Sequence, residues 1–202
     1  MDLKERIVEN SVEMFLSKGC KSVTMDEIAC ENGISKRTLY EHFRDKNTLL
    51  EECLNLMQKR MVSFTETYLA ESKSILDMVC MVHEHQSDLM INMRINFFDE
   101  LKKFYPEVFK KHYGRFLDFH RKVTIEFLQR GQDQGFFLKD IDKELVTKVL
   151  IEISSLIENA DVFSLKNHTR KQLFRESVII YFRGISTSAG IKMIDKYLNI
   201  KE

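Results

Sequence analysis

The sequence predicts an all-α protein of about nine helices, and three observations support this fold class. The 202 residues include only one proline and seven glycines, so helices meet few interruptions. Between those residues, apolar side chains recur at every third or fourth position, which is the period of an α-helix. No segment alternates apolar and polar residues convincingly, as a β-strand would. We therefore expect helices nearly throughout.

Composition excludes several classes of protein. Apolar residues make up 44% and charged residues 31% of the chain, which fits neither a disordered nor a collagen-like protein. The longest purely apolar run, residues 178–182, is far shorter than the roughly 20 residues that span a bilayer. The charged first six residues do not resemble a secretory signal. We expect a cytoplasmic protein with no membrane partner.

The first helix is expected through residues 8–18. Apolar residues form one stripe along it, and Gly19 follows where a helix favours a residue that tolerates positive φ. A second, short helix is expected just after Thr24. Thr24 and Glu27 have the spacing of a capping box, in which the hydroxyl and the carboxylate each accept a backbone N–H.

A tight turn and two more helices should follow. Residues 31–34 carry a turn signal, and Ser35 then stands as the N-cap of a third helix. Asp45 is a plausible N-cap for a longer fourth helix. The beginning of the chain therefore reads as helix, tight turn and helix, held between two longer helices.

Five further helices are expected in the rest of the chain, at residues 73–90, 94–103, 107–130, 143–159 and 170–186. Pro106 suits the first turn of a helix, where its missing N–H costs nothing. Gly131 and Gly135 should end that helix, and Asp142 can cap the next one.

The third expected helix has two chemically different faces. Leu39 and Phe43, four residues apart, share one face and are assigned to packing. The other face carries cations and hydroxyls, namely Lys36, Arg37, Thr38, Tyr40 and Arg44. Lys and Arg can bond guanine edges or neutralise phosphates, and hydroxyls bond phosphate oxygens. The alternative interpretation is a solvated helical hairpin, because charged stripes are usually exposed faces.

Charge is distributed by face in this part of the chain. The whole chain has 31 basic and 31 acidic residues, which argues against binding nucleic acid through a global field. Residues 33–46 contain four basic and two acidic side chains, whereas residues 1–60 contain ten basic and eleven acidic ones. A local cationic face is therefore predicted on a domain with no cationic excess.

The spacing of these residues closely resembles the DNA-binding region of the TetR/AcrR family of bacterial transcriptional regulators. The resemblance covers about 50 residues and rests on matched positions in fixed register: Phe15 and Gly19, Thr24 to Ala29, Gly33 to Ser35, Thr38 to Phe43, and Lys46 to Leu50. It implies a helix-turn-helix domain over residues 1–47, followed by a larger helical effector-binding and dimerisation domain over residues 48–202.

The resemblance also implies which side chains contact DNA in the major groove and along the backbone: Thr24, Ser35, Lys36, Arg37, Thr38, Tyr40, His42, Arg44 and Lys46. For His42, a half-buried ring bonded to the backbone is the alternative. Asp45 stands where the family often has Ser, Pro or Asn. Its charge slightly weakens the electrostatic argument for DNA binding.

The second part of the chain is rich in flexible apolar side chains. Nine of the fifteen phenylalanines lie between residues 97 and 137, and six of the ten methionines between residues 57 and 93. In the family such helices enclose a small-molecule pocket, which would suit an apolar or aromatic effector. The candidate lining residues are Met81, Met93, Arg94, Phe97, His112, Phe116, His120 and Phe127. Ordinary core packing is the alternative for each Met and Phe.

Metal and thiol chemistry are weakly supported. Cys80 and His83 share a helical face, but His85 points elsewhere and the set lacks standard ligand spacing. Cys30 and Cys53 have no basic cluster beside them that would lower a thiol pKa. No nucleophile–base pair, phosphate loop or metalloprotease motif is present, so we expect no cofactor, no metal and no enzymatic activity.

The last two expected helices carry apolar faces that the resemblance assigns to a two-fold, four-helix dimer interface. The candidate residues are Val149, Ile153, Leu156, Phe174, Val178, Tyr181 and Phe182. Internal packing is the alternative. A homodimer is also what DNA binding requires, because one small helix-turn-helix buries little DNA surface.

The sequence thus predicts a ligand-responsive repressor that binds a palindromic double-stranded DNA operator as a homodimer and is released by a small effector. Two alternatives stay open at this point. One is a helical protein–protein interaction module that never binds DNA, and the other is a regulator that acts without a small-molecule ligand.

Overall fold

A computed structural model describes residues 2–71, 74–77, 97–158, 162–163 and 168–198 of the chain. Two compact units make up the fold: unit 1 comprises residues 1–64 with 91–116, and unit 2 comprises residues 65–90 with 117–202. The described residues form ten α-helices and one π-helical turn, with an isolated bridge between Phe137 and Ser186 as the sole β-type pairing among them. The predicted all-α class is confirmed.

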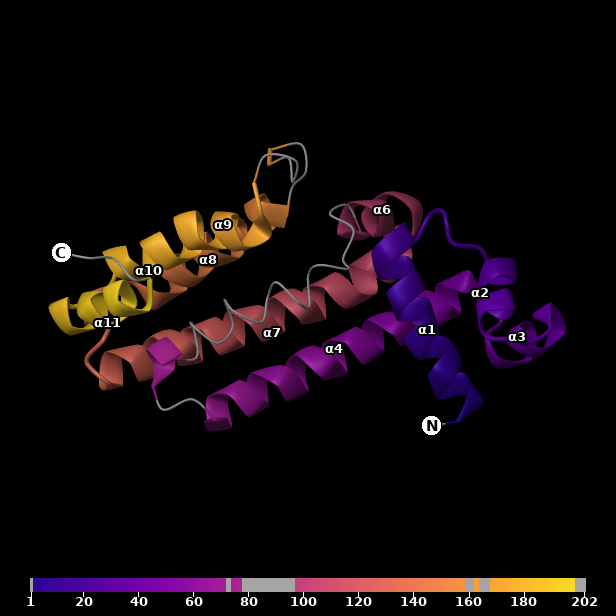
Figure 1. Ribbon diagram of the computed structural model, residues 1–202, viewed down its shortest axis with the longest axis horizontal. Coiled ribbons are helices and arrows are strands. Elements are labelled where there is room, and N and C mark those ends of the chain that lie inside the picture. The colour runs from indigo at the N-terminus through magenta and orange to yellow at the C-terminus, as the bar shows by residue number, and fades with distance from the viewer. Residues whose placement is uncertain (1, 72–73, 78–96, 159–161, 164–167, 199–202) are drawn as a thin grey trace. The chain divides into compact units, whose positions relative to one another are not determined.

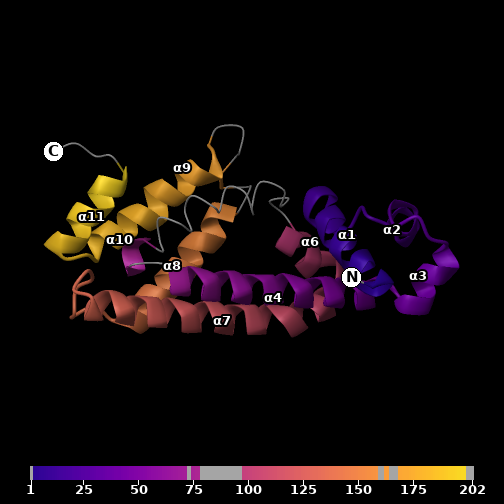
Figure 2. The ribbon, with the colours of Figure 1, turned by 60° about the horizontal axis from the view of Figure 1, so that its bottom comes forward.

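Unit 1 contains the helices of the helix-turn-helix segment and their supports. These are α1 (Leu3–Lys18), α2 (Met25–Glu31), α3 (Lys36–His42), the start of α4 (Lys46–Glu71), α6 (Phe97–Phe104) and the start of α7 (Pro106–Asp133). Within this unit, α2 and α3 lie beside each other at one end (Figure 1 and Figure 2).

Local capping determines where these helices begin and end. The first helix starts five residues earlier than its apolar stripe suggested, because Asp2 and Glu5 form a capping box there. Gly19 ends it at φ 87°, in the positive-φ region that was predicted. Asp45 Oδ1 accepts the backbone N–H of Thr48 at 2.8 Å, so the predicted cap of α4 is present.

One continuous hydrophobic core holds unit 1 together. It includes the fully buried side chains Ile7, Phe15, Ile28, Leu39, Phe43, Leu49, Leu50, Phe97 and Leu101. Burial of each such side chain is worth roughly 1.5–3 kcal/mol relative to exposure. The expected domain boundary after residue 47 falls in the first turn of α4, whose Leu49 and Leu50 belong to this core. The compact unit also gains α6 from much later in the chain.

Unit 2 contains the remainder of α4 and α7, then α8 (Lys143–Glu158), α9 (Arg170–Phe174), the π-helical turn η1 (Arg175–Ile179), α10 (Ile180–Gly184) and α11 (Ser188–Leu198). The helix expected at residues 170–186 is therefore present but interrupted by a π-helical turn. The sequence analysis missed α11. Its start contains Ser and Gly, and the cap that begins it, Thr187 Oγ1 accepting the Gly190 N–H at 3.3 Å, was not noticed.

The expected end of α7 at Gly131 was wrong, because this glycine lies inside the last turn of the helix. Its lack of a side chain serves packing: a Cβ atom here would lie 2.1 Å from Cδ2 of Phe137. Gly135, at φ 77°, supplies the positive φ that follows the helix. The Phe137 ring that covers Gly131 packs with the rings of Phe127 and Phe182 at centroid distances of 5.4 and 5.9 Å.

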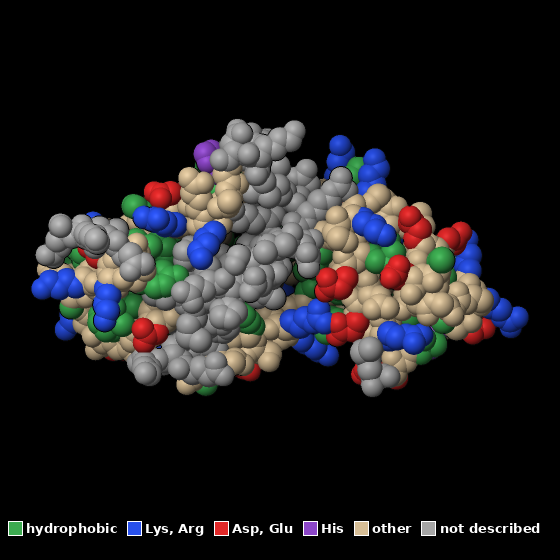
Figure 3. Space-filling model, in the orientation of Figure 1, with side chains coloured by type: hydrophobic (Ala, Val, Ile, Leu, Met, Phe, Trp, Pro, Cys, Tyr) green, Lys and Arg blue, Asp and Glu red, His purple; other side chains and the backbone are tan. Residues whose placement is uncertain are grey.

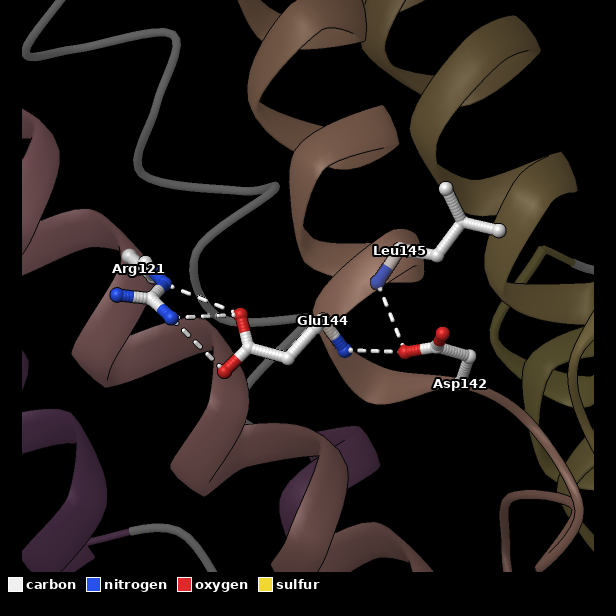
Figure 4. A network of polar contacts seen from close by, with 4 residues as sticks. All are labelled: Arg121, Asp142, Glu144 and Leu145. Carbon is white, nitrogen blue, oxygen red and sulfur yellow. Dashed lines mark hydrogen bonds and ion pairs between the residues drawn. The ribbon is translucent and has the colours of Figure 1, made fainter.

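Polar contacts fix the start of α8 in unit 2 (Figure 4). Asp142 Oδ1 accepts the backbone N–H groups of Glu144 and Leu145 at 3.0 and 3.1 Å, which confirms the predicted cap. The guanidinium of Arg121 on α7 donates to both carboxylate oxygens of Glu144, at 3.0 and 2.9 Å. This ion pair between Arg121 and Glu144 links α8 to α7 close to the Asp142 cap.

Some expectations lie outside the described residues. They are the helix over most of residues 73–90, the first residues of the helix at 94–103, and the metal hypothesis at Cys80, His83 and His85. Within the described part of the chain, no group of three His, Cys, Asp or Glu side chains could hold a metal ion.

None of the helices in the described ranges is long and apolar enough to cross a membrane.

Candidate nucleic-acid interface

Side-chain caps define both helices of the helix-turn-helix. Thr24 Oγ1 accepts the Glu27 N–H at 3.2 Å while the Glu27 carboxylate accepts the Thr24 N–H at 2.7 Å, so the predicted capping box is complete. These hydrogen bonds lower the pKa of Glu27. Ser35 Oγ accepts the Thr38 N–H at 3.0 Å and lies 2.8 Å from the Thr38 hydroxyl. Both helices therefore begin at residues fixed by local chemistry.

The turn between α2 and α3 depends on one glycine. Gly33 adopts φ 64°, a conformation that side chains other than Gly rarely accept. Its N–H donates to the Cys30 carbonyl and the Ile34 N–H donates to the Ala29 carbonyl, both at 3.0 Å. The C-terminal carbonyls of α2 are thus satisfied within the turn.

Asn32 connects this turn to α1, and the sequence analysis missed its role. Its side chain is buried, with Nδ2 donating to the Ile28 carbonyl at 2.8 Å. Its Oδ1 accepts a hydrogen bond from Asn10 Nδ2 at 3.0 Å, and its carbonyl accepts one from Arg6 at 3.2 Å. No periodic pattern marks such a residue, because Asn in a turn is usually an exposed turn former.

The two faces of α3 lie as predicted. Leu39 on the helix and Phe43 just beyond it have exposed fractions of 0%, so both pack in the core of unit 1. On the opposite face Lys36, Arg37 and Tyr40 are exposed, with Tyr40 at 43%, and Thr38 is half-buried. His42 and Arg44 are also exposed, which disfavours the half-buried alternative for the His42 ring.

Two consecutive cations of α3 form ion pairs with carboxylates of the same motif. Lys36 Nζ lies 2.7 Å from Asp26 Oδ1 on α2, and Arg37 Nε lies 3.1 Å from Glu41 Oε1 one turn later on α3. The hydrogen bond and the charge of Asp26 raise the pKa of Lys36. In Figure 3 the side chains coloured as basic and acidic alternate over the part of unit 1 that carries α2 and α3. The visible surface is therefore mixed in charge.

Lys46, the first residue of α4, is held from several sides. Its ammonium group donates to the Val23 carbonyl, just before the N-cap of α2. It also lies 5.8 Å from the ring centroid of Phe15 and 5.3 Å from that of Tyr105. These cation–π distances fix the ammonium group beside the start of α2.

The candidate effector residues are divided between the two units. Phe97, His112 and Phe116 lie in unit 1, whereas His120 and Phe127 lie in unit 2. Phe97 and Phe127 are buried in the apolar packing of their own units. Met81, Met93 and Arg94 lie outside the described residues.

The pKa values of the two candidate effector-binding histidines, His112 and His120, are both lowered. His112 is buried, and neither of its ring nitrogens has a hydrogen-bond partner within the described structure. Burial lowers the pKa of His112, helped by the nearby charge of Arg115. Burial alone lowers the pKa of His120. Both rings favour the neutral form.

The candidate dimer residues on α8 and α9–α10 differ in exposure. Leu156 is 47% exposed, and four others are half-buried: Val149, Ile153, Phe174 and Tyr181. Val178 and Phe182 are buried within the same chain, and the Phe182 ring packs 5.2 Å from that of Phe127. Leu145 and Ile180, which the sequence analysis did not single out, are 59% and 50% exposed.

A short capped helix, a glycine turn and a second capped helix that exposes cations and hydroxyls define a helix-turn-helix DNA-binding domain. The family model of the bacterial regulatory proteins of the tetR family matches residues 7–53 of this chain. The resemblance to this family that the residue pattern suggested is confirmed for these residues.

Individual relatives support this assignment over different lengths. The HTH-type transcriptional regulator YerO of Bacillus subtilis is 49% identical over 47 residues, which cover 23% of this chain but only 16% of YerO. The HTH-type transcriptional repressor KstR2 of Mycolicibacterium smegmatis is 24% identical over 157 residues, or 73% of each chain. A solved transcriptional regulator from Saccharomonospora viridis, in complex with choline, matches the fold at a TM-score of 0.77 and 18% identity, covering 91% of this chain and 97% of that one.

Proposed function

We propose that this protein is a transcriptional repressor that binds a palindromic DNA operator as a homodimer and responds to a small-molecule effector. The observation that carries the proposal is the face of α3. Lys36, Arg37 and Tyr40 are exposed there, while Leu39 and Phe43 anchor the opposite side in a rigid core. Such a helix can enter the major groove with its side chains already in register.

The exposed side chains of α3 would contact different parts of the DNA according to their chemistry. Lys36 and Arg37 would donate to guanine O6 and N7 or to phosphates, and the hydroxyls of Ser35, Thr38 and Tyr40 would bond phosphate oxygens. Thr24, His42 and Arg44 would contact the backbone beside the groove. Base contacts set the sequence preference, and backbone contacts fix the register.

Lys46 fits a phosphate role only in combination with its structural one. An ammonium group has three donors, and the Val23 carbonyl takes one of them. A phosphate would accept a second hydrogen bond from the ammonium group at the start of α4, so that Lys46 would link the DNA backbone to the residues preceding α2.

The homodimer would form through α8 and α9–α10. Leu156 and Ile180 are about half-exposed in the single chain, beside half-buried Val149, Ile153, Phe174 and Tyr181. Covering these groups with a second copy would remove apolar surface from water. The buried side chains of Val178 and Phe182 would support the interface from within each chain rather than contact the partner.

The effector would be a small molecule bound in the second part of the chain. The solved relative with choline supports this role for the fold, and the aromatic side chains of this chain suit an apolar or aromatic compound. Because α4 passes from unit 1 into unit 2, a change in its orientation would alter the spacing of two recognition helices in a dimer.

Replacing Lys36 and Arg37 together with Ala tests the DNA-binding role. We expect the affinity for an operator selected from a random duplex pool by the wild-type protein to fall by at least roughly 30-fold, since each base-edge contact is worth about 1–3 kcal/mol. The measurement is fluorescence anisotropy at two salt concentrations. Wild-type affinity should fall steeply with salt, unlike an apolar protein interface.

The matched control is Lys102→Ala with Lys103→Ala, which removes two consecutive exposed cations from α6 of the same unit. This control should bind the operator within about twofold of the wild-type protein, because neither side chain is among the proposed base contacts. Unchanged operator affinity in the Lys36 and Arg37 variant, or an equal loss in the control, would contradict the assignment of α3 as the recognition helix.

A further inference from the structure

Each of the two adjacent cations of α3 is paired with a carboxylate that the motif itself supplies. Lys36 meets Asp26 at 2.7 Å and Arg37 meets Glu41 at 3.1 Å. The side chains are open to solvent, with exposed fractions of 58% and 65% in the first pair and 89% and 58% in the second. Exposed ion pairs contribute little to the free energy of unfolding, so a role in folding stability does not account for these two acidic residues.

The positions of the two acids bring them to DNA together with the cations. Asp26 lies in the first turn of α2, next to the recognition helix, and Glu41 lies on that helix itself. A carboxylate on either helix stays close to the duplex when α3 approaches it, because the two helices carry both acids to the same surface. It must then keep its cation or face the phosphates alone, and facing them alone is repulsive.

Operator and non-operator DNA differ in whether they compensate for breaking the ion pairs of Lys36 and Arg37. Non-operator binding rests almost wholly on phosphate charge. A phosphate must compete with Asp26 for Lys36 and with Glu41 for Arg37. It has no hydrogen-bond donor for the displaced carboxylate. An operator also presents guanine acceptors to the cations and cytosine N4 donors to a carboxylate. The loss of the ion pairs is therefore offset only at a matching sequence.

We propose that Asp26 and Glu41 are specificity-determining residues that suppress binding to non-operator DNA by holding Lys36 and Arg37 in internal ion pairs. This inference rests on the proposed function of α3. It gives a role to two of the eleven acidic side chains that accompany ten basic ones in residues 1–60. Discrimination is obtained by weakening the binding that charge alone would give.

Asp26→Asn and Glu41→Gln test the proposal separately, and Glu13→Gln is the matched control. Glu13 is an exposed residue of α1, so its variant makes the same change in net charge away from the recognition face. Binding is measured by fluorescence anisotropy to a mixed-sequence duplex and to an operator of equal length selected by the wild-type protein, at about 50 and 200 mM salt. A thermal melt of each variant checks that it is folded.

We expect Asp26→Asn and Glu41→Gln each to bind the mixed-sequence duplex roughly three- to fivefold more tightly at the lower salt, the range that an exposed ion pair allows. Operator affinity should change by less, so the ratio of operator to non-operator affinity falls. The gain should shrink at the higher salt because exposed charges are screened. Glu13→Gln should leave both affinities within about twofold.

Two results would overturn the proposal while leaving the proposed function intact. One is wild-type operator binding with no gain in mixed-sequence affinity for either variant, and the other is an equal gain for Glu13→Gln. If the wild-type protein selects no sequence and the mixed-sequence duplex is bound by no variant, the DNA-binding function itself fails and this inference fails with it.

Discussion

The helix-turn-helix of unit 1 and the end of α7 in unit 2 are stabilised by contacts of very different range. In the first region the helix caps join residues three apart: Asp2 with Glu5, Thr24 with Glu27, Ser35 with Thr38, and Asp45 with Thr48. In the second region Thr187 Oγ1 donates to the Gly135 carbonyl at 2.7 Å, and the Leu138 N–H donates to the Ile185 carbonyl at 3.0 Å.

This difference in range accounts for a difference in predictability. A helix cap between residues three apart depends only on a few neighbouring residues, so it can be recognised without any knowledge of the fold. A pairing across some fifty residues exists only when packing has already brought the two segments together. Three predictions test the contrast, and the largest effect is expected where contacts are nonlocal.

Phe137→Ala should cost about 3–5 kcal/mol of unfolding free energy, because it empties a site that is 1% exposed and packed against two other rings. Denaturant unfolding monitored by circular dichroism measures the loss. The neighbouring Leu138→Ala, at a residue 39% exposed, should cost less than about 1 kcal/mol. Equal losses at the two positions would mean that the aromatic cluster does not organise unit 2.

Asn32→Ala should cost about 1–3 kcal/mol, because the change leaves the Asn10 amide without its partner and removes one of the two hydrogen bonds that the Ile28 carbonyl accepts. Asn32 is the nonlocal exception within the helix-turn-helix, so its loss should exceed that of a local cap. Combining Asn10→Ala with Asn32→Ala in a double-mutant cycle should give a coupling energy of about 1 kcal/mol. Additive losses would mean that the two amides do not interact. Asn47→Ala, at an exposed position, is the control.

The smallest effect concerns the pH dependence of stability at His112. Because burial lowers the pKa of His112 in the folded chain, the unfolded chain takes up a proton first as the pH falls below about 6.5. The stabilising effect of the neutral ring is therefore complete above pH 6.5 and is lost on acidification.

His112→Leu removes this proton uptake. Its melting temperature should fall less between pH 7.5 and pH 5.5 than that of the wild-type protein. Identical pH profiles for His112→Leu and the wild-type protein would show that burial of His112 is not linked to stability. The pKa of His120 is lowered in the same direction, so His120 contributes to the pH dependence with the same sign.

The sequence analysis succeeded wherever one residue type has a local task. It placed Gly19, Thr24, Ser35, Asp45 and Asp142 correctly because each ends or caps a helix through its own backbone preference or side chain. It also assigned Leu39 and Phe43 to the core, since a period of four on a short amphipathic helix leaves one apolar face.

It failed where a residue acts on distant parts of the chain. Gly131 looked like a helix end, yet it lies inside α7 because the Phe137 ring occupies the space of a side chain. Asn32 looked like an ordinary turn residue, and its burial depends on α1. No helix was expected at the start of α11, because Thr187 could not be identified as a cap without the segment at residues 135–136.

Sequence by itself determined the helical class, the helix-turn-helix and the resemblance to the tetR family, because local capping, periodicity and fixed spacing are properties of neighbouring residues. Only the tertiary structure decided that α6 packs with the DNA-binding helices, that Asp26 holds Lys36, and that Phe182 faces its own chain. The physical reason is the range of the interactions. A hydrogen bond between residues three apart depends only on those neighbouring residues. A buried contact or an ion pair between helices depends on how the whole chain packs.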